Sequence, residues 1–289
     1  MTDVQRTLYG FGLGYAATRL ARHLCPRGWK TRGTVREEAK ATALVSQSIK
    51  AVLWSGAPGE PLPTPPHGAH WLISIPPDEW GCPAFRAFAP SAATASTITY
   101  LSTSGVYGDL DGGWAFETAP VNPGSARAHA RVLAEDQWRS VRADACIVRL
   151  PGIYGPGRSA FDRLRKGTAR RIIKPGQVFS RVHVDDIASG LMAILAHPRP
   201  RGIYHLCDDE PAPPQDVIAH AATLLGHPTP PDLPIDQADL SPMARSFYSE
   251  CKRLSNARTK AALHWTPTYP TYREGLAAIL TEERDDPPE

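Results

Sequence analysis

The sequence lacks the cysteine spacing of a metal or redox site. Its five cysteines, at positions 25, 82, 146, 207 and 251, are far apart and include no C-x-x-C pair. A zinc site or a dithiol centre is therefore not indicated. We expect reduced, mostly buried thiols and no bound metal.

Long apolar runs and blocks of one charge are also missing. No stretch approaches the roughly 18 consecutive apolar residues of a membrane span. The net charge of +3 comes from 32 Lys and Arg against 29 Asp and Glu, spread along the chain, so no nucleic-acid partner is indicated. The opening MTDVQRTLYGFG contains an acid and no long apolar segment. We expect a cytoplasmic protein without a membrane span.

Short apolar runs alternate with helix-like segments in the first half of the chain, which is typical of a parallel sheet with helical crossovers. The segment 56–70 is rich in proline, and because proline blocks a helix we expect an irregular loop there. The expected strands are Thr7–Phe11, Lys30–Val35, Ala51–Trp54, Trp71–Ile75, Thr99–Ser102 and Cys146–Leu150.

Helical patterns follow the strands. Asp185 and Asp186 precede one of them and suit a helix N-terminus, as cap and as dipole partner. From Asp208 onward the helices are short and punctuated by proline, which indicates a second unit. The expected helices are Val132–Val141, Ile187–Leu195, Arg253–Leu263 and Tyr272–Leu280, with a frayed tail at Asp285–Glu289.

The chain of 289 residues, 42% of them hydrophobic, is long enough for one large domain and a smaller one. We predict an α/β fold with a Rossmann-type doubly wound parallel sheet and a smaller C-terminal substrate domain. The sheet domain comprises residues 1–152 and about 181–207, and the substrate-side domain comprises residues 153–180 and 208–289.

A glycine turn follows the first expected strand. Gly12, Gly14 and Ala17 form a G-x-G-x-x-A pattern that runs into a helix-like segment. Gly12 permits the tight turn, Gly14 lets the backbone approach a diphosphate, and Ala17 lets the helix pack closely on the strand. The free amides of the helix N-terminus then face the phosphates. The pattern predicts a dinucleotide site.

The second expected strand is followed by Arg36, where an NAD-binding domain carries an acidic residue for the ribose. A guanidinium can pair with the 2′-phosphate of NADP, which a carboxylate would repel. NADP is therefore the expected cofactor, with NAD as the alternative. A solvated arginine at the end of a strand is the structural alternative.

Four segments occur in order along the chain: Tyr100–Asp109 (YLSTSGVYGD), Arg149–Gly157 (RLPGIYGPG), Arg181–Asp186 (RVHVDD) and Tyr204–Asp209 (YHLCDD). Together they resemble the extended short-chain dehydrogenase/reductases of the NAD-dependent epimerase/dehydratase family. The G-x-G-Y start and Ile75-Pro76-Pro77 are similar to an atypical bacterial subgroup labelled YeeZ-like. The resemblance spans nearly the whole chain.

This resemblance implies a set of site residues. Thr103 matches the Ser/Thr that hydrogen-bonds the substrate oxygen, with backbone capping as its structural alternative. Tyr154 lies in the loop that matches the nicotinamide-side wall, which makes it a candidate for proton transfer beside His129 and Tyr107. Further residues placed at the cofactor by the resemblance are Tyr15, Ile75, Pro76 and Pro151.

The Tyr-x-x-x-Lys slot of typical relatives falls on Arg127 and Arg131. Because arginine stays protonated, Arg127 cannot give and retake a proton as tyrosine does. Arg131 could hold the ribose or phosphate of the cofactor, and the two cations would suit an anionic substrate. In the structural alternative, Arg131 pairs with Glu135 at i,i+4 and Arg127 is solvated.

We therefore expect an NADP-dependent oxidoreductase or epimerase-like enzyme, with Thr103, Tyr154 and Arg127 as candidate catalytic residues. It would transfer hydride at a hydroxyl or carbonyl carbon of a small-molecule substrate, anionic or nucleotide-linked. The alternative is an NADP-binding sensor or regulatory protein that lost catalysis with the Tyr-x-x-x-Lys pair. Analogy with dimeric relatives suggests a homodimer.

Overall fold

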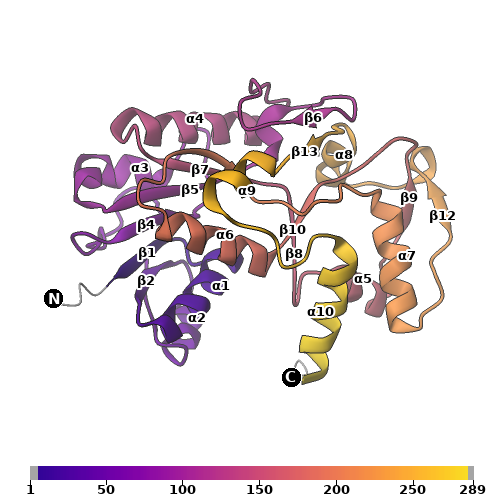
Figure 1. Ribbon diagram of the computed structural model, residues 1–289, viewed down its shortest axis with the longest axis horizontal. Helices are drawn as coiled ribbons and strands as arrows, with labels where there is room; N and C mark the ends of the chain where they lie inside the picture. The colour runs from indigo at the N-terminus through magenta and orange to yellow at the C-terminus, as the bar shows by residue number, and fades with distance from the viewer. Residues whose placement is uncertain (1–5, 286–289) are drawn as a thin grey trace.

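The computed structural model describes residues 6–285 and contains a seven-stranded parallel sheet (Figure 1). The strand order is β11-β7-β5-β4-β1-β2-β3. Strands β2 and β3 therefore extend the sheet on one side of β1, and the later strands β4, β5, β7 and β11 extend it on the other side. This reversal confirms the doubly wound Rossmann-type fold and puts the topological switch point between β1 and β4, the position at which such sheets bind ligands. The strands are β1 (Thr7–Phe11), β2 (Lys30–Val35), β3 (Ile49–Leu53), β4 (His70–Ile73), β5 (Thr97–Thr103), β7 (Cys146–Leu150) and β11 (Gly202–His205).

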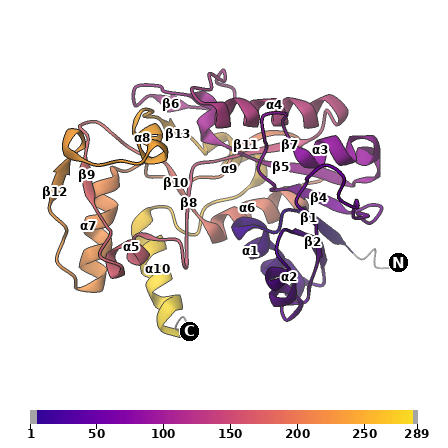
Figure 2. The ribbon, with the colours of Figure 1, turned by 180° about the vertical axis from the view of Figure 1, so that it is seen from behind.

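Helices cover both faces of the sheet (Figures 1 and 2). On one face lie α1 (Tyr15–Leu24), α2 (Glu38–Val45) and α6 (Val184–Ala196); on the other lie α3 (Pro83–Phe88) and α4 (Ala126–Val141). Strand residues alternate between the two cores, because successive side chains point to opposite faces. Leu8 of β1 packs toward α1 and α6, whereas Tyr9 packs among the aromatic residues under α3 and α4.

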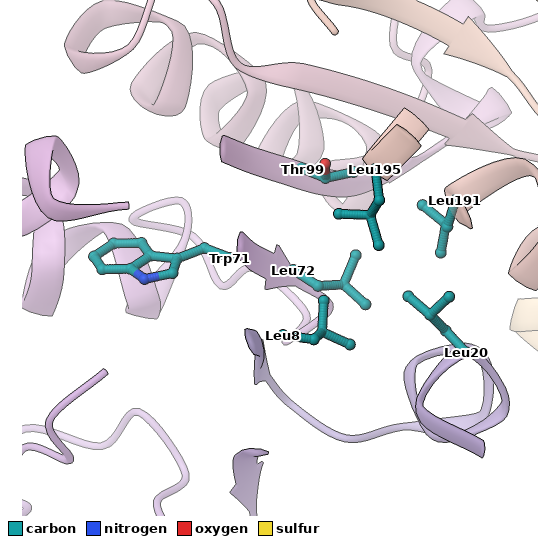
Figure 3. Close-up of a pocket in the computed structure, with 7 residues that line it drawn as sticks. All are labelled: Leu8, Leu20, Trp71, Leu72, Thr99, Leu191 and Leu195. Carbon is teal, nitrogen blue, oxygen red and sulfur yellow. The ribbon is translucent and has the colours of Figure 1, made fainter. Parts of the chain in front are cut away.

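The core beneath α1 and α6 is closely packed. A void of about 10 Å³ lies there, next to β1, β4 and α6, and Figure 3 shows the side chains around it. This is about the space of one water probe, so it cannot hold a ligand. Its lining residues are Leu8, Leu20, Trp71, Leu72, Thr99, Leu191 and Leu195.

A separate apolar cluster forms the core of the C-terminal part. Phe161 of α5 (Ala160–Arg165), Ile218 of α7 (Pro214–Leu225) and Leu276 of α10 (Tyr272–Asp285) are buried in it. The substrate-side unit and its domain boundaries stay a prediction. The remaining elements are three strand pairs and two helices: β8 (Gly152–Tyr154) with β10 (Arg181–His183), β9 (Arg171–Ile173) with β12 (Asp232–Pro234), β6 (Trp114–Ala115) with β13 (Arg253–Leu254), α8 (Pro242–Tyr248) and α9 (Ala257–Leu263).

The predicted helix at residues 253–263 is wrong in its first part. Arg253 and Leu254 form β13, and the pairing continues when the amide of Ser255 donates to the carbonyl of Ala115. The helix begins only at Ala257, because the preceding backbone is held in this extended pairing. Strand β11 was not expected from the sequence. The irregular loop is confirmed over residues 56–69, and His70 already belongs to β4.

Helix boundaries also differ from those expected. Helix α4 begins at Ala126, six residues earlier, because Ser125 accepts a hydrogen bond from the amide of Ala128. His183, not an aspartate, caps α6 through its ring nitrogen. Helix α10 runs to Asp285, and the remainder of the expected frayed tail, 286–289, lies outside the described residues.

Within residues 6–285, no helix combines the length and the apolar character needed to cross a membrane. The five cysteines are unpaired: three are buried and two are half-buried. The described part of the chain also contains no group of three or more His, Cys, Asp or Glu side chains that could hold a metal ion.

Candidate dinucleotide site and reaction centre

The turn after β1 requires glycine at its first position. Gly12 has φ of +86°, and a Cβ there would lie 2.9 Å from the backbone nitrogen of Ile75. The amide of Gly12 donates to the hydroxyl of Thr34 at 2.8 Å, and the amide of Leu13 donates to the carbonyl of Thr34 at 2.7 Å. The turn is thus held against both neighbouring strands, at the point where the sheet order reverses.

The start of α1 is open to a ligand. Gly14 is the N-cap residue and no side chain caps the helix, so its first-turn amides lack intrahelical partners. A Cβ on Gly14 would meet only the Ser74 hydroxyl, at 3.8 Å. Ala17 is fully buried, which holds the helix close to the sheet. Free amides, open space and the helix dipole together suit an anionic diphosphate.

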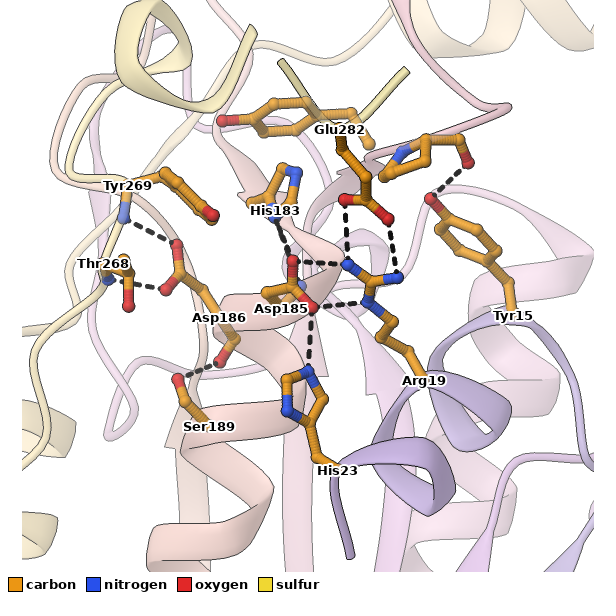
Figure 4. Close-up of polar contacts among 12 residues, drawn as sticks. Tyr15, Arg19, His23, His183, Asp185, Asp186, Ser189, Thr268, Tyr269 and Glu282 are labelled. Carbon is orange, nitrogen blue, oxygen red and sulfur yellow. Dashed lines mark hydrogen bonds and ion pairs between the residues drawn. The ribbon is translucent and has the colours of Figure 1, made fainter. Parts of the chain in front are cut away.

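Tyr15 connects this turn to the loop after β8. Its hydroxyl donates to the carbonyl of Pro156 at 2.9 Å (Figure 4), and the guanidinium of Arg158 lies 5.8 Å from its ring centroid. Burial raises the pKa of Tyr15 to about 12, although the charges of Arg19 and Arg158 oppose the rise. Tyr15 therefore stays neutral and joins two segments beside the dinucleotide turn.

Arg36 follows β2 directly and is exposed. Among the described residues its guanidinium has no hydrogen-bond or ion-pair partner, so it is available to a ligand phosphate. Ile75 and Pro76 follow β4: Ile75 is buried with its backbone against Gly12, and Pro76 is exposed. These positions lie at the carboxyl ends of strands next to the reversal in strand order.

Thr103 ends β5 and is half-buried. Its hydroxyl oxygen accepts a hydrogen bond from the amide of Gly105 at 3.2 Å, so the capping alternative considered for it is present in the structure. The hydroxyl proton can still be donated to another oxygen. Capping and substrate contact are thus compatible at this residue.

The two arginines of α4 differ in their surroundings. Arg127 is exposed, in the first turn of the helix. Arg131 is half-buried and donates to the carbonyl of Leu101 at 2.7 Å and the hydroxyl of Tyr100 at 3.1 Å. The guanidinium of Arg131 therefore lies at the end of β5, two residues before Thr103.

The structural alternative for Arg131, an ion pair with Glu135, is wrong. Glu135 is buried beneath α4 and pairs with Arg149 of β7 at 2.6 Å, while the hydroxyl of Ser102 donates to it at 2.5 Å. Two neighbouring strands of the sheet, β5 and β7, supply these partners, and helical spacing alone cannot reveal them. Arg131 points instead to the strand end described above.

Arg149 continues this buried network toward β11. Its guanidinium donates to the Tyr107 hydroxyl at 2.8 Å, and Tyr107 lies 2.5 Å from Nε2 of His205. Because Nδ1 of His205 donates to the carbonyl of Ser255 at 2.8 Å, Nε2 accepts the Tyr107 proton. Burial raises the pKa of Tyr107 and lowers that of His205. Tyr107 is therefore enclosed, and sequence reasoning missed its partners.

The other candidates for proton transfer, Tyr154 and His129, form no hydrogen bond with Thr103 among the described residues. The Tyr154 hydroxyl lies against Gly275 of α10 and donates to the carbonyl of Thr271, just before that helix, at 3.5 Å. Burial strongly raises the pKa of Tyr154. This geometry favours a packing role, so its catalytic role stays a prediction. His129 is exposed on α4, and Pro151 is half-buried in the link between β7 and β8.

His183 is the N-cap residue of α6. Its Nδ1 accepts from the amide of Asp185 at 3.3 Å, and burial lowers the pKa of His183 to about 4. The neighbouring Asp186 carboxylate accepts from the amides of Thr268 and Tyr269, at 2.6 and 3.1 Å (Figure 4). The two hydrogen bonds to Asp186 hold the segment at Thr268 and Tyr269 that leads into α10.

Comparison with known proteins identifies relatives of the whole chain and of parts of it. The model of the NAD dependent epimerase/dehydratase family matches residues 87–207. A solved structure of a functionally unknown conserved protein from Silicibacter pomeroyi DSS is 49% identical, with 96% of this chain and 99% of that chain covered and a TM-score of 0.89.

Two further similarities concern proteins with printed names. A 3-diazoavenalumate denitrifying reductase from a Streptomyces species is 33% identical over 170 residues, which are 54% of this chain and 54% of that protein. The match thus spans about half the length of that relative. The human epimerase family protein SDR39U1, solved with NADPH, shares the fold at 16% identity, with a TM-score of 0.74 and coverage of 96% and 99%.

Proposed function

We propose that this chain, whose residues 87–207 match the NAD dependent epimerase/dehydratase family, is an NADP-dependent oxidoreductase of that family acting on an anionic small molecule. The observation that carries the proposal is the uncapped start of α1 behind Gly12, with an unpaired Arg36 at the end of the adjacent strand. This arrangement fits a dinucleotide that carries an additional phosphate.

The residues around the turn fit the parts of this cofactor. The first-turn amides of α1 would bind the diphosphate. Arg36 would pair with the 2′-phosphate, and Arg131 would line the nicotinamide side from the end of β5. When bound, the reduced nicotinamide supplies a hydride. The structural relative solved with NADPH supports a nicotinamide dinucleotide in general, and the preference for the extra phosphate rests on Arg36 alone.

Thr103 and Arg127 would act on the substrate. The Thr103 hydroxyl would donate to the oxygen on the carbon that receives or loses hydride, while its lone pair keeps the hydrogen bond from Gly105. Arg127 would bind a carboxylate or phosphate as a permanent cation, since it cannot exchange a proton at ordinary pH. The G-x-G-Y start and the Ile75-Pro76-Pro77 segment support a place in the YeeZ-like subgroup.

A turnover assay tests this function. Purified protein is mixed with NADPH and a panel of keto acids, and with NADP⁺ and the matching hydroxy acids, while absorbance of the reduced nicotinamide is followed. Because the Streptomyces relative is named as a reductase of 3-diazoavenalumate, the panel includes a diazo-substituted organic acid. We expect Thr103→Ala to lower turnover at least tenfold. We expect Arg127→Ala to lower it by raising KM.

A sensor or regulatory role is the second candidate. It is favoured by one observation: the lysine position is filled by Arg131, whose guanidinium is held by the Leu101 carbonyl. NADPH binding without turnover of any panel compound would favour this role over the enzyme. Turnover that Thr103→Ala leaves unchanged would remove Thr103 from the mechanism.

A further inference from the structure

Two adjacent glutamates near the end of α10 contact arginines on two different helices. Glu282 pairs with Arg19 of α1 (Figure 4), the helix that starts at the dinucleotide turn. Glu283 pairs with Arg165 of α5, at 2.6 Å. The last turns of α10 therefore bridge the dinucleotide-side helix and the second apolar core (Figure 1).

Arg19 is held by two carboxylates at once. Its Nε and Nη2 donate to the two oxygens of Asp185 at 2.5 and 2.9 Å. Its Nη1 and Nη2 donate to the two oxygens of Glu282, each at 3.1 Å. Both pairs are bidentate, a geometry that restricts orientation as well as distance. The guanidinium thus joins α1, α6 and α10 at one point.

The Asp185 side of this junction is the more buried. The Asp185 side chain is 17% exposed, against 42% for Glu282. Burial alone would raise the pKa of Asp185, but hydrogen bonds from Arg19 and His23 and the charge of Arg19 lower it to about 2. Asp185 is therefore ionised throughout the neutral range, and Glu282 is the partner that a surface substitution can remove without disturbing the core.

Arg19 also lies on the face of α1 that carries Tyr15, since residues four apart share a helix face. Tyr15 ties the first turn of α1 to the loop at Pro156, and Arg19 ties the second turn to α6 and α10. The position of the first-turn amides depends on these two contacts, together with the close approach of Gly12 to Ile75.

We infer that Glu282 of the C-terminal helix is a positioning residue for the cofactor: through Arg19 it holds the dinucleotide-binding end of α1. The inference rests on the proposed function. It implies a reciprocal effect, because two linked equilibria change each other by the same factor. If the docking of α10 strengthens dinucleotide binding, then dinucleotide binding stabilises the docking of α10.

The chain offers a matched control at the next residue. Glu283→Ala also removes one carboxylate and one arginine partner from α10, but that partner is on α5. Alanine maintains the helix in both variants. Since the Glu283 side chain is only 13% exposed, against 42% for Glu282, Glu283→Ala should destabilise the fold at least as much as Glu282→Ala.

The experiment is calorimetric titration of the full chain with NADP⁺ at low salt. We expect Glu282→Ala to raise the Kd about threefold, the size of a partly exposed ion pair, and Glu283→Ala to leave it unchanged. The difference between wild type and Glu282→Ala should shrink in 1 M salt, where the screening length is about 3 Å. Arg19→Lys, which retains the charge but loses the fork, should also raise the Kd.

Hydrogen exchange gives the reciprocal readout. NADP⁺ should slow amide exchange in α10 of the wild type and of Glu283→Ala, and should slow it less in Glu282→Ala. If NADP⁺ binds the wild type and Glu282→Ala with equal Kd, or leaves α10 exchange unchanged, the inference is overturned. If the wild type does not bind NADP⁺ at all, the proposed function fails instead.

Discussion

Among single residues, Arg36 gives the sharpest test of cofactor choice. Removing its guanidinium should weaken the binding of NADP⁺ by roughly 1.5–3 kcal/mol, the value of a hydrogen-bonded charged contact, and leave the binding of NAD⁺ nearly unaffected. Titration of Arg36→Ala with both dinucleotides measures the difference. Lys40→Ala, which removes an exposed cation from the following helix, is the control. Equal losses for both dinucleotides would contradict a role for Arg36 at the 2′-phosphate.

Glu135 is a residue whose substitution should affect stability. In Glu135→Gln the buried Arg149 would lose its counter-ion, and breaking such a pair typically costs about 3–5 kcal/mol. Urea denaturation measures the free energy of unfolding. Asp144→Asn breaks the more exposed pair with Arg142 and should cost about 1 kcal/mol or less. Similar losses of unfolding free energy in both variants would show that the buried pair contributes no more to stability than the exposed pair.

The residues of the turn could be predicted from sequence, but the partners of α4 could not. Gly12 and Gly14 serve local backbone geometry, which a short motif encodes. The partner of Glu135 is Arg149, which comes from a strand that only the sheet order brings beneath the helix. A spacing of four residues suggested Arg131 instead, because periodicity does not show which charged residue faces inward.

In the element formed by the turn and α1, a substitution of Gly14 distinguishes an effect on dinucleotide binding from an effect on folding. Ala fits the backbone angles of Gly14, and its Cβ would contact only the Ser74 hydroxyl. We expect Gly14→Ala to lower the stability of the fold by about 1 kcal/mol or less. We expect it to lower the affinity for NADP⁺ at least tenfold, because the added Cβ occupies the space for the diphosphate. Thermal unfolding and titration measure both. Undiminished NADP⁺ affinity would place the diphosphate elsewhere.

Elements with a strong local signal were predicted well. Strands β1, β2 and β7 have the expected bounds, and α1 follows the glycine turn directly. Strand β11 and the short pairs such as β6 with β13 were missed, because their two to four residues form strands only through distant partners. The same distant pairing replaced the first turn of the helix expected at Arg253.

In the whole molecule, stability should depend on pH through Asp208. Its carboxyl is 2% exposed and has no hydrogen-bond partner among the described residues. Burial raises its pKa from 3.8 to about 8, although the charge of Arg181 opposes the rise. Between these values the folded state retains a proton that the unfolded state releases, so the stability contributed by this group is lost as the pH rises toward 8.

Asp208→Asn removes this titration. We expect the variant to gain stability relative to wild type as the pH increases from 5 to 8, with little further change above that range. Denaturant midpoints at several pH values measure it. Parallel pH profiles for the two proteins would show that the buried carboxyl does not titrate in this range.

The match to the family model and the parallel sheet could be predicted from combined motifs, whereas the arrangement around the site required the structure. Tyr154 was expected at the nicotinamide side, yet its hydroxyl packs against α10. The link from α10 to α1 joins residues more than 260 positions apart, beyond the reach of any local pattern. The homodimer and the cytoplasmic location stay predictions.

The most direct measurement is calorimetric titration of the purified chain with NADP⁺ and with NAD⁺. Amides in an uncapped helix start, beside an unpaired arginine, should give saturable binding of NADP⁺ and weaker binding of NAD⁺. Absence of a binding isotherm for both dinucleotides, in oxidised and reduced form, would contradict the account.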